Sequence, residues 1–146
     1  LGLIEPEVFV AAITGSTGSG RTPTAGTHHP QRQSDLYAYG ALAHRHAPEI
    51  QALARAASGV DAHVAFVPHS GSFARGIHAT VQARLATPMS GEDVRAALAG
   101  FYAHSPFVRV VDAPPRLKDV VTSNHAQLSA ACDGRSAAVM SVLDNL

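Results

Sequence analysis

The stretch that decides the fold is GIHATVQARLA, residues 76–86. Its apolar side chains alternate with polar ones, so that Ile77, Val81 and Leu85 share one face, as in a half-buried strand. The turn at Asp133-Gly134 predicts a hairpin between the last two strands of the chain. Shorter strand signals lie at residues 8–13, 36–40, 63–67, 107–111, 128–131 and 137–143. The sequence therefore predicts six or seven strands, most of them clustered.

Two segments predict helices, at residues 48–57 and from Ser90 to about Ala103. Pro48 suits a first helical turn, and Ser90 followed by Asp93 is a helix-start signature. The faces expected to be buried are Ile50, Leu53, Ala54 and Ala57 in the first helix, and Val94, Ala97, Leu98 and Phe101 in the second. Clustered strands with two helices predict an α+β domain: a largely antiparallel or mixed sheet with helices covering one face.

Length and composition predict one globular domain over residues 1–146. Lys plus Arg balance Asp plus Glu at 11 each, so no net field attracts nucleic acid or an anionic membrane. The absence of a membrane-spanning run and the single Cys132 are typical of a cytoplasmic, reducing compartment. The apolar ends, residues 1–4 and 139–146, look cut from a longer chain, and as unpaired strands they are expected to favour self-association.

The sequence GSTGSGRT, residues 15–22, has the spacing of a phosphate-binding P-loop, with Arg21 in place of the lysine. A P-loop needs a helix directly after it, and Pro23, Gly26 and Pro30 exclude one, so nucleotide hydrolysis is not expected. Residues 15–30 instead predict a loop without regular structure. Its amides, hydroxyls and guanidinium suit a small anion; the alternative is a tight connection that is merely polar.

Nine histidines are present, and His44-Arg45-His46 is the sharpest local feature. In an extended segment both imidazoles face the same side, where one can move a proton and the other can hold a substrate group. The plain alternative is a pair of structural histidines at a helix start. A zinc site built from His28, His29, His44 and His46 is a third interpretation, but cysteine ligands and the usual helical spacing are both missing.

Several motifs occur in one order along the chain. They are TGSTGSGR at 14–21, Tyr39 five residues before HRHAPEI at 44–50, FVPH at 66–69, RGIHAT at 75–80, Ser123-Asn124, and LDNL at 143–146. Together they resemble the N-acetyl-γ-glutamyl-phosphate reductase family of the semialdehyde dehydrogenase superfamily. The resemblance covers essentially the whole chain.

The resemblance implies a fold, a reaction and a set of site residues. The fold is that of a C-terminal domain like that of glyceraldehyde-3-phosphate dehydrogenase, used for substrate binding and dimerisation. The reaction is NADPH-dependent reduction of N-acetyl-γ-glutamyl phosphate to the semialdehyde in arginine biosynthesis, by a homo-oligomer, dimer or tetramer, that holds no metal. His44 is the implied acid/base; the implied substrate contacts are Ser16, Arg21, Tyr39, His46 and Arg75.

The chain departs from the family in two ways. The nucleophilic cysteine and the Gly-rich nucleotide segment are absent and are expected upstream of Leu1, and Cys132 matches no catalytic motif. NADP is therefore expected to bind mainly to the missing domain, and residues 1–146 alone are expected to be inactive. Two alternatives stay open: a lysine-branch α-aminoadipyl-phosphate reductase, favoured by His28-His29-Pro30, and a non-catalytic metal-binding or dimerisation module.

Overall fold

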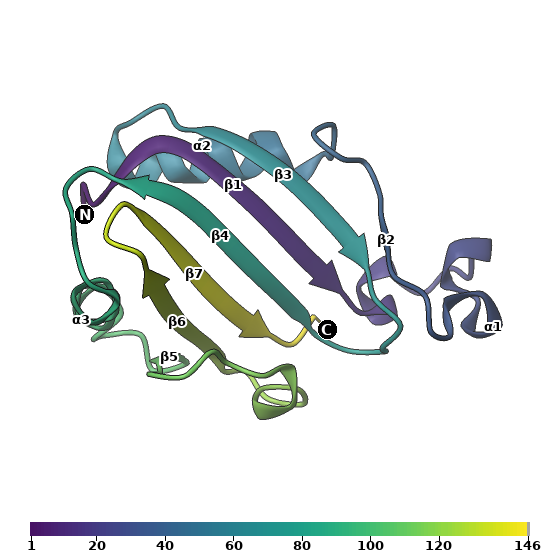
Figure 1. Cartoon of the computed structure of the whole chain (residues 1–146). Helices are drawn as coiled ribbons and strands as arrows, with labels where there is room; N and C mark the ends of the chain where they lie inside the picture. The colour runs from purple at the N-terminus through teal and green to yellow at the C-terminus, as the bar shows by residue number, and fades with distance from the viewer. Residues whose placement is uncertain (146) are drawn as a thin grey trace.

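The structure, a computed structural model, describes residues 1–145, with His29 described by its backbone only. Within this range the chain forms one seven-stranded sheet with the strand order β2-β3-β1-β4-β7-β6-β5 (Figure 1). The strands are β1 (Ile4–Thr14), β2 (Tyr37–Ala38), β3 (His63–Ser70), β4 (Ile77–Leu85), β5 (Val108–Val110), β6 (Ala126–Cys132) and β7 (Ser136–Leu143). Every strand signal in the sequence corresponds to one of them.

The sheet is mixed, as expected. β1 pairs in parallel with β3 and antiparallel with β4, and β5 pairs in parallel with β6. β6 and β7 form the antiparallel pair around Asp133-Gly134, where Gly134 has a φ of 90° and Asp133 Oδ1 accepts from the amides of Arg135 and Ser136. The predicted hairpin is therefore confirmed.

Two helices cover the same face of this sheet. α2 (His46–Ser58) packs on β3, and α3 (Gly91–Phe101) packs on β6. The register places Val64 and Phe66 of β3 on the same face as Ala130 of β6, and all three are buried. The core under α3 consists of Leu85, Val94, Ala130 and Ala137, with Met89, Leu98, Cys132 and Val139 packed around it. The expectation of helices on one face is confirmed.

The faces that α2 and α3 bury against the sheet differ from those expected from the sequence, because some of the predicted side chains are exposed. In α2, Leu53 is 64% exposed and Ala57 is exposed; the half-buried stripe is Ala47, Ile50, Gln51 and Ala54. α2 lies over β3, near the sheet edge, so a stripe of four side chains is enough to cover it. Phe101 is 61% exposed, because α3 ends at this residue and Tyr102 takes the half-buried place.

The expectation of unpaired terminal strands is wrong for Ile4 and for β7, whereas Leu1 lies outside the sheet and is 70% exposed. β7 lies inside the sheet between β4 and β6, and Ile4 pairs with Leu85. Leu146 lies outside the described residues. No helix within residues 1–145 is long and apolar enough to cross a membrane.

Within residues 1–145, no helix covers β1, β3 and β4 on the opposite face of the sheet, and Figure 1 views the molecule from this side. Phe9 lies near its centre and is 51% exposed. Shallow grooves flank Phe9 and are lined mainly by small or apolar side chains: Ala11, Ala65, Val67 and Thr80 on one side, and Ala131, Ser136 and Ala138 on the other. We call this surface the open face.

Candidate functional site

The connection between β1 and β3 carries five of the six candidate residues: Ser16, Arg21, Tyr39, His44 and His46. Parallel neighbours cannot be joined by a hairpin, so the chain leaves the C-terminal end of β1 and returns through α2 to the start of β3. The C-terminal ends of β1, β3 and β7 meet at one end of the sheet (Figure 1). Ser16 and Arg21 directly follow this end of β1, and Tyr39, His44 and His46 lie further along the connection.

The Gly-rich loop starts directly after β1 and is tied to the turn between β3 and β4. The amides of Gly15, Ser16 and Thr17 donate to the carbonyls of Gly76, Phe73 and Ala74 at 2.8, 3.1 and 3.0 Å. A Cβ at Gly15 would lie 2.5 Å from the Ala74 carbonyl oxygen, so only glycine fits. These three amides are occupied and cannot bind an anion.

The expectation of a loop without regular structure was wrong in part. Residues 16–19 form the 3₁₀ turn η1 (Ser16–Ser19), and η2 (Ala25–Thr27) and the four-residue α1 (His29–Arg32) follow. The half-buried Ser16 hydroxyl makes no hydrogen bond to another described residue, and the exposed Arg21 guanidinium pairs with none of them. The polar groups available to a ligand are therefore side chains.

The His44-Arg45-His46 segment is not extended, which corrects the backbone expected from the sequence. Arg45 has helical dihedral angles (φ −55°, ψ −24°), and His46 is the first residue of α2. The two imidazoles still meet edge to face at 4.7 Å between ring centroids, and the amide of His46 donates to His44 Nδ1 at 3.3 Å. The His44 ring also contacts Tyr39 and Phe66, at 5.4 Å each.

The surroundings of His44 and Tyr39 shift the pKa of each of these side chains. Burial, followed by the neighbouring His46 and Arg45, lowers the pKa of His44 below that of a free histidine. Since Nδ1 accepts from the His46 amide, the proton of neutral His44 resides on Nε2. Burial, followed by the neighbouring Tyr37, raises the pKa of Tyr39, which therefore keeps its hydroxyl proton at neutral pH.

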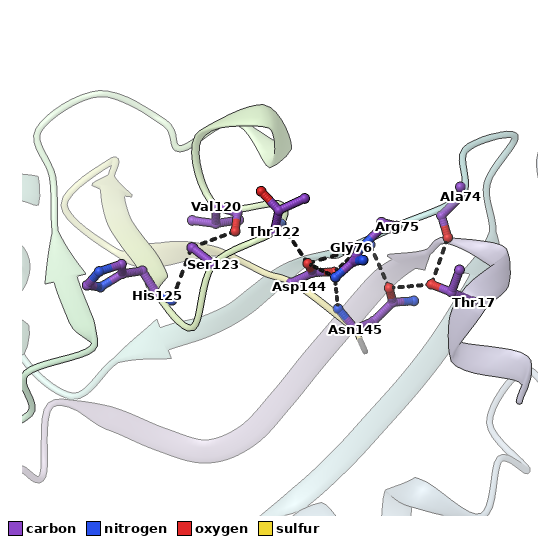
Figure 2. A network of polar contacts seen from close by, with 10 residues as sticks. All are labelled: Thr17, Ala74, Arg75, Gly76, Val120, Thr122, Ser123, His125, Asp144 and Asn145. Carbon is purple, nitrogen blue, oxygen red and sulfur yellow. Dashed lines mark hydrogen bonds and ion pairs between the residues drawn. The ribbon is translucent and has the colours of Figure 1, made fainter.

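Arg75 lies in the turn between β3 and β4 and forms an ion pair with Asp144. Its Nε and Nη2 donate to the carboxylate of Asp144, with Nη2 at 2.5 Å. Asp144 also accepts from the amides of Thr122 at 2.7 Å and Asn145 at 2.8 Å, as Figure 2 shows. The hydrogen bonds from Arg75 are the main reason that the pKa of Asp144 is lowered. Only Nη1 of Arg75 lies outside this pair.

Sequence reasoning missed Asn145 as a site residue. From its place after β7, the Asn145 side chain forms hydrogen bonds both to the start of the Gly-rich loop and to the amide of Gly76. The only sequence signal was its place in the LDNL motif, which says nothing about its contacts.

The described residues contain no group of three or more His, Cys, Asp or Glu side chains arranged to hold a metal ion. The His29 side chain, one of the four candidates for zinc, lies outside the description. Cys132 is half-buried, and burial, with Asp133 nearby, raises the pKa of its thiol. A raised pKa disfavours the thiolate, which agrees with the view that Cys132 is not a nucleophile.

Residues 1–145 match the family model described as "Semialdehyde dehydrogenase, dimerisation domain". The chain belongs to this family. Its curated relatives include the N-acetyl-gamma-glutamyl-phosphate reductases of Dehalococcoides mccartyi (40% identical over 99% of the chain) and Bacteroides fragilis (36% over 99%). The chain spans 43% and 44% of these two proteins, less than half of their length.

Solved structures of semialdehyde dehydrogenases share the fold of this domain. The aspartate semialdehyde dehydrogenase II of Vibrio cholerae, complexed with ASA, aligns with a TM-score of 0.72 and 11% identity over 96% of the chain and 49% of its own. A probable aspartate-semialdehyde dehydrogenase from Pseudomonas aeruginosa aligns with a TM-score of 0.70 and 15% identity over 95% of the chain and 49% of its own. At these identities the likeness concerns the fold.

Replacing Asp144 by Asn is expected to lower the urea midpoint of this semialdehyde dehydrogenase domain at pH 7, because Arg75 loses its charged partner. A carboxylate with a lowered folded-state pKa contributes stability above its unfolded pKa of about 3.9, and this contribution is lost as the pH falls through the folded-state value. The difference between wild type and variant should therefore shrink below about pH 4. Asp61→Asn, in the exposed pair with Arg55, is the matched control and should change little. A constant difference down to pH 2 would contradict this account.

Proposed function

We propose that this chain is the substrate-binding and dimerisation domain of a cytoplasmic, NADPH-dependent reductase that converts N-acetyl-γ-glutamyl phosphate to the semialdehyde in arginine biosynthesis. The observation that carries the proposal is the contact of His44 with Tyr39 and His46, on the same β1–β3 connection that carries the Gly-rich loop, in a chain whose curated relatives bear the name of that reductase. An acyl phosphate needs polar side chains that bind an anion and a group that transfers protons. The free Ser16 and Arg21 side chains suit the first role, and the histidine pair suits the second.

In this proposal His44 transfers the proton through Nε2, since Nδ1 is held by the His46 amide. Tyr39 stays protonated and contacts the same ring, so it can donate a hydrogen bond toward the substrate. Ser16, Arg21 and His46 contact the anionic and polar groups of the substrate, and Nη1 is the only nitrogen that Arg75 can offer. We do not propose Cys132 as the thiolate that accepts the acyl group, because its segment matches no catalytic motif and burial raises the pKa of its thiol.

Reduction of an acyl group needs a hydride donor, and family resemblance assigns that chemistry to a nicotinamide cofactor, NADPH. The Gly-rich loop does not fit its pyrophosphate. The loop amides at residues 15–17 are bonded to carbonyls, and η1 has only four residues in place of the helix that a dinucleotide loop requires. We therefore assign NADPH binding mainly to residues other than those described.

The alternative substrate is the α-aminoadipyl phosphate of the lysine branch. Its support is His28-His29-Pro30, in a segment held against the end of β3 by Arg32, which is buried and donates to Ser70 Oγ at 2.5 Å. The two substrates differ by one methylene, which is worth about 1–3 kcal/mol of discrimination. The ratio of kcat/KM on the two acyl phosphates, measured with the full-length protein, decides between them.

His44→Asn in the full-length protein is expected to lower kcat by about 10²–10⁴-fold, the loss typical of a missing general acid or base. Because the pKa of His44 is lowered, the wild-type pH profile should lose activity on the acid side below the usual histidine value. The measurement is NADPH consumption with the acyl phosphate from pH 5 to pH 9. His104→Asn, on an exposed histidine in the turn after α3, is the matched control. Wild-type turnover by His44→Asn across this range would remove His44 from the mechanism.

We further propose that the partner of the open face is a second copy of this chain. The exposed Phe9, between two shallow grooves lined mainly by small and apolar side chains, supports a sheet-to-sheet contact. The family description as a dimerisation domain supports the choice of a copy over an unrelated protein. The candidate loop lies at the end of β1, beyond this surface.

Phe9→Asp is expected to shift the protein from dimer toward monomer, because it places charge in the centre of the contact. Phe101→Asp is the matched control: Phe101 is 61% exposed but lies at the end of α3, away from the open face. Sedimentation velocity over a concentration series measures both variants. A dimer that resists Phe9→Asp but dissociates with Phe101→Asp would place the interface elsewhere.

A further inference from the structure

We propose that Asn145 is a positioning residue that, together with Thr17, holds the backbone around Ser16 in place, so that the Ser16 hydroxyl can bind the substrate. This inference rests on the proposed function, because it assumes that the Gly-rich loop contacts an acyl phosphate. Asn145 lies two residues after β7, about 130 residues along the chain from the loop that its side chain contacts (Figure 2).

The carboxamide of Asn145 uses both of its polar atoms. Oδ1 accepts from the Gly76 amide at 2.7 Å and lies 2.9 Å from the hydroxyl oxygen of Thr17. Nδ2 donates to Thr14 Oγ1 at 3.2 Å and to the Gly15 carbonyl at 3.1 Å. An amide side chain has two donor hydrogens and an acceptor oxygen with two lone pairs, so this set of contacts fills its capacity.

Thr17 completes the arrangement from the other side. Its hydroxyl lies 2.9 Å from both Asn145 Oδ1 and the Ala74 carbonyl, and with one hydrogen it donates to one of them at a time. With either acceptor, the hydrogen bond connects Thr17 to the residues that hold the Gly-rich loop, Ala74 or Asn145. Gly18 leaves the space for this contact, because a Cβ there would lie 2.8 Å from Asn145 Nδ2.

The residues on both sides of Ser16 in the chain take part in these contacts. Thr14 and Gly15 precede it, Thr17 follows it, and all three are bonded to Asn145 or lie within bonding distance of it. The Ser16 amide itself donates to the Phe73 carbonyl at 3.1 Å. Ser16 therefore has fixed neighbours and a fixed amide, while its hydroxyl makes no hydrogen bond within residues 1–145. The backbone that carries the hydroxyl is fixed in this way, so that the free hydroxyl starts from a preorganised position when it binds a substrate oxygen.

The test uses four variants of the full-length protein. Thr17→Val removes the hydroxyl and keeps the shape, and Thr17→Ser keeps the hydroxyl. Asn145→Asp keeps the acceptor Oδ1 and replaces the donor Nδ2 with a carboxylate oxygen, which cannot donate to Thr14 Oγ1 or to the Gly15 carbonyl. Thr87→Val, an exposed threonine in the turn after β4 at the opposite end of the sheet, is the matched control. KM and kcat for the acyl phosphate and KM for NADPH are measured at a temperature where all variants are folded.

We expect kcat/KM for the acyl phosphate to fall about 10-fold in Thr17→Val and about 10²-fold in Asn145→Asp, with KM for NADPH within 2-fold of wild type. Thr17→Ser and Thr87→Val should stay within 2-fold on every constant. A role in stability alone would lower the melting temperature and leave these constants unchanged, and that result overturns the inference. If the wild-type protein does not reduce the acyl phosphate at all, the proposed function fails first, and the two failures are thereby distinguished.

Discussion

The parallel pairing of β1 with β3 is the constraint on which the arrangement of the site depends. Their register runs from Glu7 opposite His63 to Thr14 opposite Ser70, so the chain must travel back the length of the sheet between them. α2 makes that return on the face that Phe66 and Val64 bury. The Gly-rich loop is thereby left at the end of β1, and the histidine pair at the start of α2. An antiparallel pairing with a short turn would leave no room for either.

Alternation and capping signals were enough to predict the strands and both helices, because these are local properties. The N-terminal part of β1 was missed, since Glu5, Pro6 and Glu7 interrupt the apolar run and the register shifts between Ile4 and Val8. The position of β7 inside the sheet was also missed. Strand order depends on contacts between distant segments, and no pattern within residues 136–143 distinguishes an inner strand from an edge strand.

The candidate site was predictable in its residue types but not in its geometry. His44 and His46 are neighbours, as expected, but a turn and a helix start bring the rings together, not an extended segment. The Gly-rich loop was expected to bind an anion partly through its amides, but the amides of residues 15–17 are occupied by the turn between β3 and β4, a contact that spans about sixty residues. Arg75 looked available in the sequence because its partner, Asp144, lies at the other end of the chain. In each case a long-range contact decided what a local motif could do.

The two proposed roles of the domain use β1 in different ways. The open face depends on the alternation of the strand, which turns Phe9 away from α2 while Val10 faces the helix side with Phe66. The candidate site depends on where the strand ends, five residues later at Thr14, which at about 3.3 Å per residue is roughly 17 Å away. His44 contacts Phe66 and therefore lies on the covered side of the sheet. A second copy on the open face would thus leave the histidines and the Gly-rich loop uncovered, so association and substrate binding can be altered independently, with additive effects when the substitutions are far apart.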